Sequence, residues 1–154
     1  MGPIMLIVIL GAAAVGGYYY WKFDLQQKAA EQAVAGDFSG IDCGAFNSTT
    51  ESDPARLRAI ACMSKALKAC DSARMRNSSN ILAVESYEIV GEDGAACQVR
   101  WTQNAKPPQS TSLCRYDMST INATFVAMEA RGDNGDNLFS LMAMNDVNNM
   151  SRCQ

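Results

Sequence analysis

The chain contains no histidine among its 154 residues. Histidine is the side chain that titrates near neutral pH, so its absence removes the usual general base, the nucleophile–histidine pairs of covalent catalysis, and most zinc and haem sites. The chain also lacks a CxxC pair and a glycine-rich phosphate loop, which argues against thioredoxin-like redox chemistry, zinc knuckles and nucleotide binding. We therefore expect a protein that is not an enzyme, with no catalytic residue, no metal and no cofactor.

Positive charge is also scarce, since the net charge is −3 and no basic stripe occurs, so nucleic acid is not an expected partner. Carboxylates are the one remaining route to hydrolysis, and nothing in their spacing marks two of them as an acid/base pair. We interpret them as solvated surface charge and keep a membrane-tethered hydrolase only as a third hypothesis. The carboxylates concerned are Glu85, Glu88, Glu92, Asp93, Asp117 and Glu129.

Charge is missing altogether from the first 21 residues. As a helix, the segment from Pro3 to Trp21 is roughly 28 Å long, which matches the hydrocarbon core of a bilayer, about 30 Å thick. Aromatic residues favour the headgroup level, and four of them close the run: Tyr18, Tyr19, Tyr20 and Trp21. We predict a transmembrane anchor over residues 1–22. The alternative is a cleaved signal peptide, which the absence of a basic segment before the apolar run disfavours.

Small residues recur four apart in this anchor, at Ala12/Gly16 and Ala13/Gly17. Such pairs allow two membrane helices to approach closely, so we expect a packing role beside other spans or other copies of the chain. Residues 23–36 are polar and rich in Gln and Ala, and we predict a helical stalk there. Residues 37–154 then form one domain.

Cysteine is abundant outside the anchor, and the six cysteines form an even set. Disulfides persist in oxidising compartments, so we predict a single-pass membrane protein whose C-terminal domain is periplasmic or extracellular. Lys22 and Lys28 would favour the opposite orientation, but Asp24 and Glu31 cancel their charge locally. Four Asn-x-Ser/Thr sequons are candidate glycosylation sites in the same compartment. They lie at Asn47, Asn77, Asn122 and Asn149.

The exported part is expected to be an α+β domain. Ser52-Asp53-Pro54 is a strong helix start, and we predict one long helix from there to about Arg74. Arg58, Lys65 and Lys68 fall on its narrow polar face. Alternating apolar and polar residues predict a 3–4-stranded antiparallel meander on which this helix packs. Its strands are expected at 81–90, 96–103, 113–118 and 123–130, followed by a short helix over 137–145.

All six cysteines are expected to form disulfides. We favour two bridges from Cys62 and Cys70 on the helix to Cys97 and Cys114 on the sheet, with Cys43 joined to Cys153. Six cysteines allow 15 connectivities, and a bridge between Cys97 and Cys114 is the main alternative.

The segment 131–137, Arg-Gly-Asp-Asn-Gly-Asp-Asn, admits three interpretations. Asp133 and Asp136 are oxygen ligands on a short loop, as a Ca²⁺ site requires, but the regular ligand spacing and terminal Glu of an EF-hand are absent. Arg-Gly-Asp is also a cell-adhesion tripeptide. We favour a plain turn, because Gly, Asn and Asp tolerate turn dihedral angles.

These features favour a non-enzymatic structural or accessory subunit of a membrane or envelope complex. Its expected partners are the bilayer and either other membrane proteins or copies of itself. The order of elements also resembles that of a type IV pilin: an apolar N-terminal helix, an amphipathic continuation, an antiparallel sheet and a cysteine near the C-terminus. The resemblance implies a subunit of an extracellular filament held together by its anchor helices. Pilins usually carry a glutamate as the fifth mature residue, where this chain has Met5.

Overall fold

The computed structural model describes residues 17, 21, 38–47, 50, 52–78, 84–104, 110–145 and 153. The chain divides into two compact units, Met1–Asp37 and Phe38–Gln154. Within the described residues no helix is both long and apolar enough to cross a membrane. The predicted anchor and stalk, with the packing residues Ala12, Ala13 and Gly16 and the three tyrosines, lie outside the described residues. Gly17 and Trp21 are described, and both are helical.

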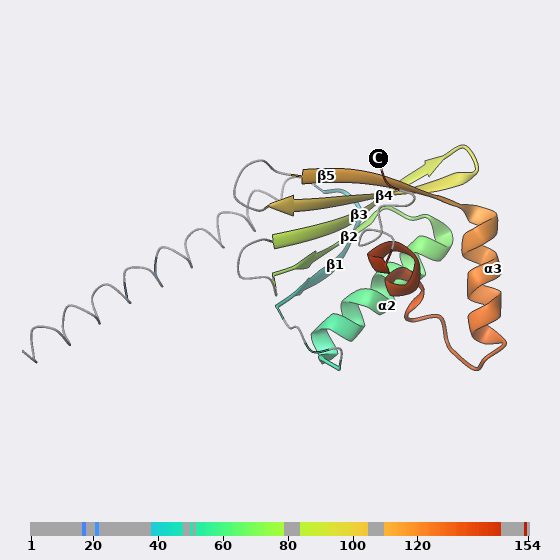
Figure 1. Cartoon of the computed structure of the whole chain (residues 1–154), viewed down its shortest axis with the longest axis horizontal. Coiled ribbons are helices and arrows are strands. Elements are labelled where there is room, and N and C mark those ends of the chain that lie inside the picture. The colour runs from blue at the N-terminus through green and yellow to red at the C-terminus, as the bar shows by residue number, and fades with distance from the viewer. Residues whose placement is uncertain are drawn as a thin grey trace, which may run out of the picture. The chain divides into compact units, whose positions relative to one another are not determined.

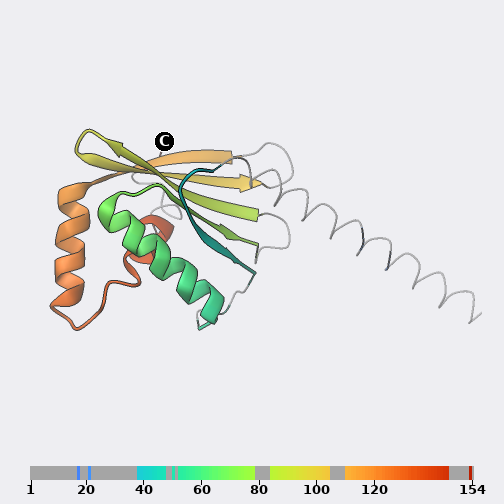
Figure 2. The same cartoon turned by 180° about the vertical axis from the view of Figure 1, so that it is seen from behind.

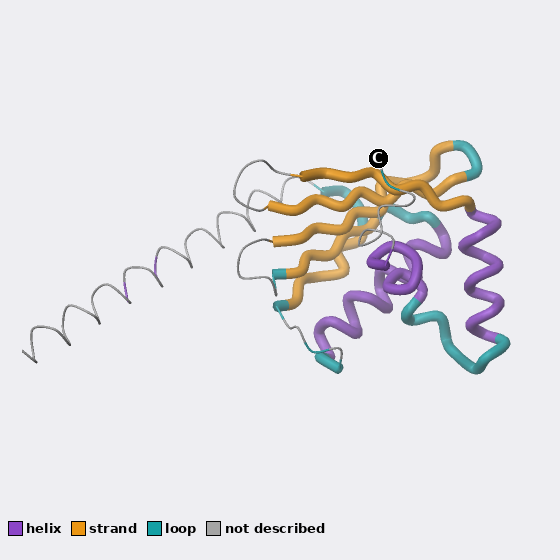
Figure 3. The backbone as a smooth tube through the Cα atoms, in the orientation of Figure 1, coloured by secondary structure: helices purple, strands orange, loops and turns teal. Residues whose placement is uncertain are grey.

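The second unit is a small α+β domain built on one five-stranded sheet (Figures 1 and 3). Its strands are β1 (Ile41–Phe46), β2 (Ala73–Asn77), β3 (Val84–Asp93), β4 (Ala96–Asn104) and β5 (Ser110–Asp117), and they lie in that order across the sheet. The pairs from β2 to β5 are antiparallel, whereas β1 pairs with β2 in parallel. The predicted antiparallel meander is confirmed in part, since the strands expected at 81–90, 96–103 and 113–118 correspond to β3, β4 and β5. The sheet is mixed, however, because a helical crossover after β1 places that strand parallel to β2.

Three helical elements lie to the same side of the sheet in both views: α2 (Pro54–Ala69), α3 (Met118–Glu129) and the π-helical turn η1 (Ser140–Met144) (Figures 1 and 2). The start of α2 is as predicted, since the Asp53 side chain caps it by accepting from the backbone N–H groups of Ala55 and Arg56. The predicted end of this helix, at about Arg74, is wrong. The helix stops at Cys70, which takes a left-handed conformation, and Arg74 belongs to β2.

The strand predicted at 123–130 is also wrong, because this segment belongs to α3. Its inward residues are Ile121, Phe125 and Met128, spaced four and three apart as one face of a helix requires. The run Thr124-Phe125-Val126 consists of residue types that are enriched in strands, which favoured the wrong assignment.

The core fills the space between the sheet and the three helical elements, since its buried residues come from α2, α3 and η1 as well as from the strands. One row of cross-strand partners on this inner face runs Ala73, Ile89, Val99 and Cys114, all of them fully buried. The side chains of Met63 and Leu67 on α2, also fully buried, belong to the same hydrophobic cluster. Burying these apolar side chains stabilises the domain by about 25 cal/mol for each Å² of apolar surface removed from water.

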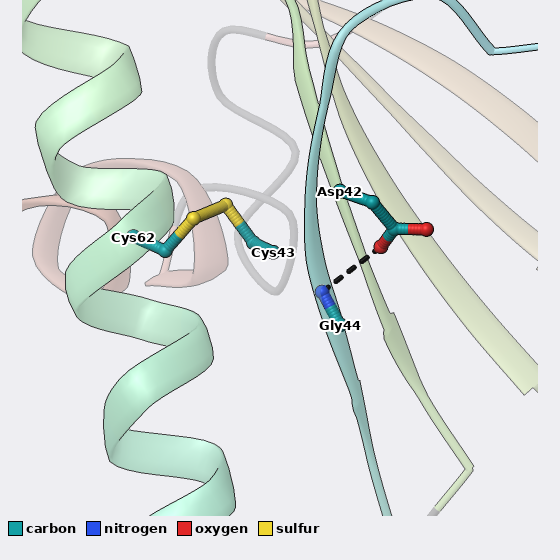
Figure 4. The surroundings of a disulfide bond; sticks show 4 residues. All are labelled: Asp42, Cys43, Gly44 and Cys62. Atoms are coloured by element: carbon teal, nitrogen blue, oxygen red, sulfur yellow. Dashed lines mark hydrogen bonds between the residues drawn. A yellow bond between two sulfur atoms is a disulfide. The ribbon is translucent and has the colours of Figure 1, made fainter.

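All six cysteines are in disulfides: Cys43–Cys62, Cys70–Cys97 and Cys114–Cys153. Two of these bridges join α2 to the sheet, as expected, but only the Cys70–Cys97 bridge joins it to the meander. Cys62 instead reaches the edge strand β1 (Figure 4). The expected pair of Cys43 with Cys153 is wrong because β1 and β5 are opposite edges of the sheet. The alternative pair of Cys97 with Cys114 fails because Cys97 lies opposite Tyr116.

Candidate docking groove beside helix α2

The exposed face of α2 combines positive charge with apolar surface. At about 100° per residue, Leu57, Arg58, Ala61, Lys65 and Lys68 fall within an arc of roughly 100°. Leu57 is 47% exposed, and the three cationic side chains are exposed as predicted. We call these five residues the α2 stripe. The helix contains four basic residues and no acidic one, although the chain as a whole has a net charge of −3.

A groove runs along one flank of this stripe, with a cavity volume of about 440 Å³. One wall comes from α2 and the other from α3 and the loop that follows it. The residues that line it are Ala61, Cys62, Ser64, Lys65 and Lys68 of α2, Phe125 of α3, and Asn134, Gly135 and Asp136 of the loop. We call it the α2 groove.

The loop wall is a set of tight turns. Asp133 Oδ1 accepts from the backbone N–H of Gly135 at 3.0 Å, and Asn134 Oδ1 accepts from the backbone N–H of Asp136 at 3.2 Å. Gly135 has φ +78°, and a Cβ atom there would collide with the Phe125 ring. These contacts are what the turn interpretation of segment 131–137 requires. Within the described residues, no three His, Cys, Asp or Glu side chains gather where a metal ion could bind.

Ser64 fastens the loop to α2. Its hydroxyl donates to the backbone carbonyl of Asp136 at 2.7 Å and accepts from the backbone N–H of Phe139 at 2.9 Å. Ser64 is 2% exposed and Phe139 is fully buried, so the bond between them is shielded from water, whereas Asp136 is exposed. A buried polar group of this kind is retained only when it is satisfied. The two walls of the groove are therefore held at a fixed distance by one side chain.

The rim of the groove is electropositive. The Lys68 ammonium lies 3.3 Å from the centroid of the Phe125 ring, a cation–π contact. Lys65 and Arg58 have no ion-pair partner within the described part of the chain. Asp136 is the one carboxylate in the lining, and its oxygen already accepts from the side-chain amide of Asn134. A ligand in this groove therefore meets two amino groups beside an apolar surface.

On the opposite face of the sheet the cationic side chains are ion-paired. Arg74 and Arg76 both reach Asp42, at 3.2 and 3.5 Å, and Arg100 reaches Glu88 at 3.1 Å. Burial raises the pKa of Asp42, but the Gly44 N–H bond (Figure 4) and the two arginines outweigh it and hold that pKa below its ordinary value of 3.8. Each of these cations is therefore ion-paired within the domain.

The six carboxylates considered for hydrolysis do not share one site. Glu88 lies on the outer face of the sheet, whereas Glu85 lies on the inner face and accepts from the Asn77 side chain at 3.0 Å. Asp93, the last residue of β3, pairs with Arg115 of β5 at 2.7 Å. Burial, and then the charge of Glu85, raise the pKa of Tyr87 well above its ordinary range. The three others, Glu92, Asp117 and Glu129, lie at the ends of β3, β5 and α3.

The sequons lie in different surroundings. Asn47 and Asn122 are exposed, the second on α3. Asn77 is half-buried in β2 and its amide is bonded to Glu85. Asn149 lies outside the described residues.

The groove itself was not predicted from the sequence. Ser64 alone offered a signal, since it is a hydroxyl residue at a buried position of an otherwise apolar helix face. Comparisons of the chain with models of protein families, with curated proteins and with solved structures gave no match.

Proposed function

We propose that this chain is a non-enzymatic, membrane-anchored structural or accessory subunit of a membrane or envelope complex, and that its disulfide-linked domain docks a partner protein in the α2 groove. The observation that carries the proposal is the α2 stripe with its groove. Leu57 is half exposed and Lys65 has no partner in the described chain, while the adjoining wall is fixed by Ser64. Apolar and charged groups left exposed beside a rigid concavity are typical of a protein-binding surface.

The anchoring and the compartment are supported by other features. The first 21 residues carry no charge, which is typical of a membrane span. Three disulfides in one small domain favour an oxidising environment outside the cytoplasm.

The test is photocrosslinking in cells that make the full chain. A benzophenone amino acid replaces Leu57 on the α2 stripe or, as the matched control, the exposed Thr111 at the start of β5. We expect one discrete membrane or envelope protein, captured in fixed ratio, from the first site and not from the second. The proposal is wrong if neither site, or both sites equally, yield adducts.

A filament subunit is the second candidate. The four-stranded antiparallel part of the sheet and the Cys114–Cys153 bridge near the C-terminus agree with a pilin-like plan. In that case the crosslinked partner is another copy of this chain, and electron microscopy of the purified material shows long polymers.

A further inference from the structure

We infer that the occupant of the α2 groove is an acidic segment of the partner protein, with an apolar side chain between its carboxylates. This inference rests on the proposed function and specifies its partner. The distribution of charge favours an acidic occupant. Each arginine described in β2, β4 and β5 is ion-paired with an acidic residue of the same domain. Lys65 and Arg58 on α2 are not, in the part of the chain that the structure describes.

The surface between the cations is apolar. Ala61 lies between Arg58 and Lys65 on the α2 stripe, and the Phe125 ring forms the facing wall. Small and aromatic carbon surfaces of this kind suit an apolar side chain. The concavity also favours a peptide over a lipid bilayer, because a membrane surface cannot enter a groove bounded by a fixed loop.

The spacing of the cations sets the spacing of the carboxylates. Arg58 and Lys65 are seven residues apart, or about 10 Å along the helix axis at 1.5 Å per residue. An extended chain advances about 3.3 Å per residue and its side chains alternate between two faces, so carboxylates on one face lie two or four residues apart, about 7 or 13 Å. A separation of four residues lies within reach of the long Arg and Lys side chains and places one apolar side chain between the carboxylates on the same face.

The probe is a displayed library of random twelve-residue peptides, selected on the full chain in phosphatidylcholine nanodiscs. The selected peptides are then titrated against the wild type and against the double variant Arg58→Gln/Lys65→Gln, the α2 cation variant. The matched control is Arg100→Gln/Arg115→Gln, which removes the same charge from the sheet. We expect enrichment of acidic residues flanking an apolar one. The α2 cation variant should bind about two- to thirty-fold more weakly, as the loss of two partly exposed ion pairs implies, with no change in the control.

Three results overturn the inference. The enriched peptides lack acidic residues, or the α2 cation variant binds them as the wild type does, or no peptide is selected and the chain binds phosphatidylglycerol vesicles instead, which assigns the stripe to a membrane surface. The crosslink from position 57 separates this inference from the proposed function. An undiminished adduct in the α2 cation variant refutes the acidic segment and leaves docking intact, whereas no adduct in the wild type refutes docking itself.

Discussion

Ser64→Ala is the substitution that tests most sharply how the groove is held open. It removes one hydroxyl from a site that is 2% exposed. The Phe139 N–H, on a fully buried residue, then loses its acceptor, and the Asp136 carbonyl loses its donor. Asp136 is exposed, so water replaces the second bond at little cost.

The cost is therefore dominated by one unsatisfied buried N–H. Such a group costs about 1–3 kcal/mol. We expect the free energy of unfolding to fall by about 2 kcal/mol, a large part of the total for a small domain. With a urea m-value of about 2 kcal/mol/M, the midpoint moves by about 1 M.

Urea denaturation of the full chain under non-reducing conditions measures this shift, and Ser119→Ala in the exposed first turn of α3 is the matched control. Hydrogen exchange at the Phe139 amide should accelerate in the Ser64 variant. A loss below about 0.5 kcal/mol, or unchanged exchange at that amide, would refute the assignment of Ser64 as the residue that fixes the loop wall.

Three further outcomes are expected. Replacing both Cys43 and Cys62 by Ala opens a loop of 19 residues, and the chain-entropy model assigns a loss of about 3 kcal/mol, measurable by urea denaturation. Gly135→Ala should lower the free energy of unfolding more than Gly132→Ala does in the same assay. Both glycines have φ +78°, and the left-handed strain alone costs about 1–3 kcal/mol. Only Gly135 also lacks room for a Cβ atom. Asp42→Asn should lower the free energy of unfolding at pH 7, and its difference from the wild type in that free energy should shrink below about pH 3.8. The reason is that a carboxyl with a lowered folded-state pKa loses its stabilising contribution as it is protonated. Urea denaturation at pH 7 and at pH 2.5 measures this difference.

Local signals in the sequence identified part of this fold. The capping pair before α2 and the alternation of β4 are both properties of a few neighbouring residues, and both were predicted correctly. The end of α2 was missed because its cap is Cys70, with φ 52°, where glycine normally marks a left-handed stop. The Cys70–Cys97 bridge holds that residue in place, and no local pattern shows such a constraint.

The edge strand and the groove depend on contacts between distant parts of the chain. β1 is six residues long, is interrupted by a bulge, and pairs in parallel only after α2 has crossed the sheet. The groove needs Ser64 to meet Phe139, 75 residues away. Neither contact leaves a periodic pattern in the sequence. The helical period of α2 therefore predicts its exposed cations but not the wall of the groove that faces them.

Electron microscopy of the natively purified protein, with mass spectrometry of everything that co-purifies, shows whether a partner occupies the α2 groove. We expect a particle that contains a second protein, with density of that protein seated in the α2 groove against Lys65 and Phe125. A partner bound only to the opposite face of the sheet, or a chain that purifies alone as a monomer, would contradict this expectation.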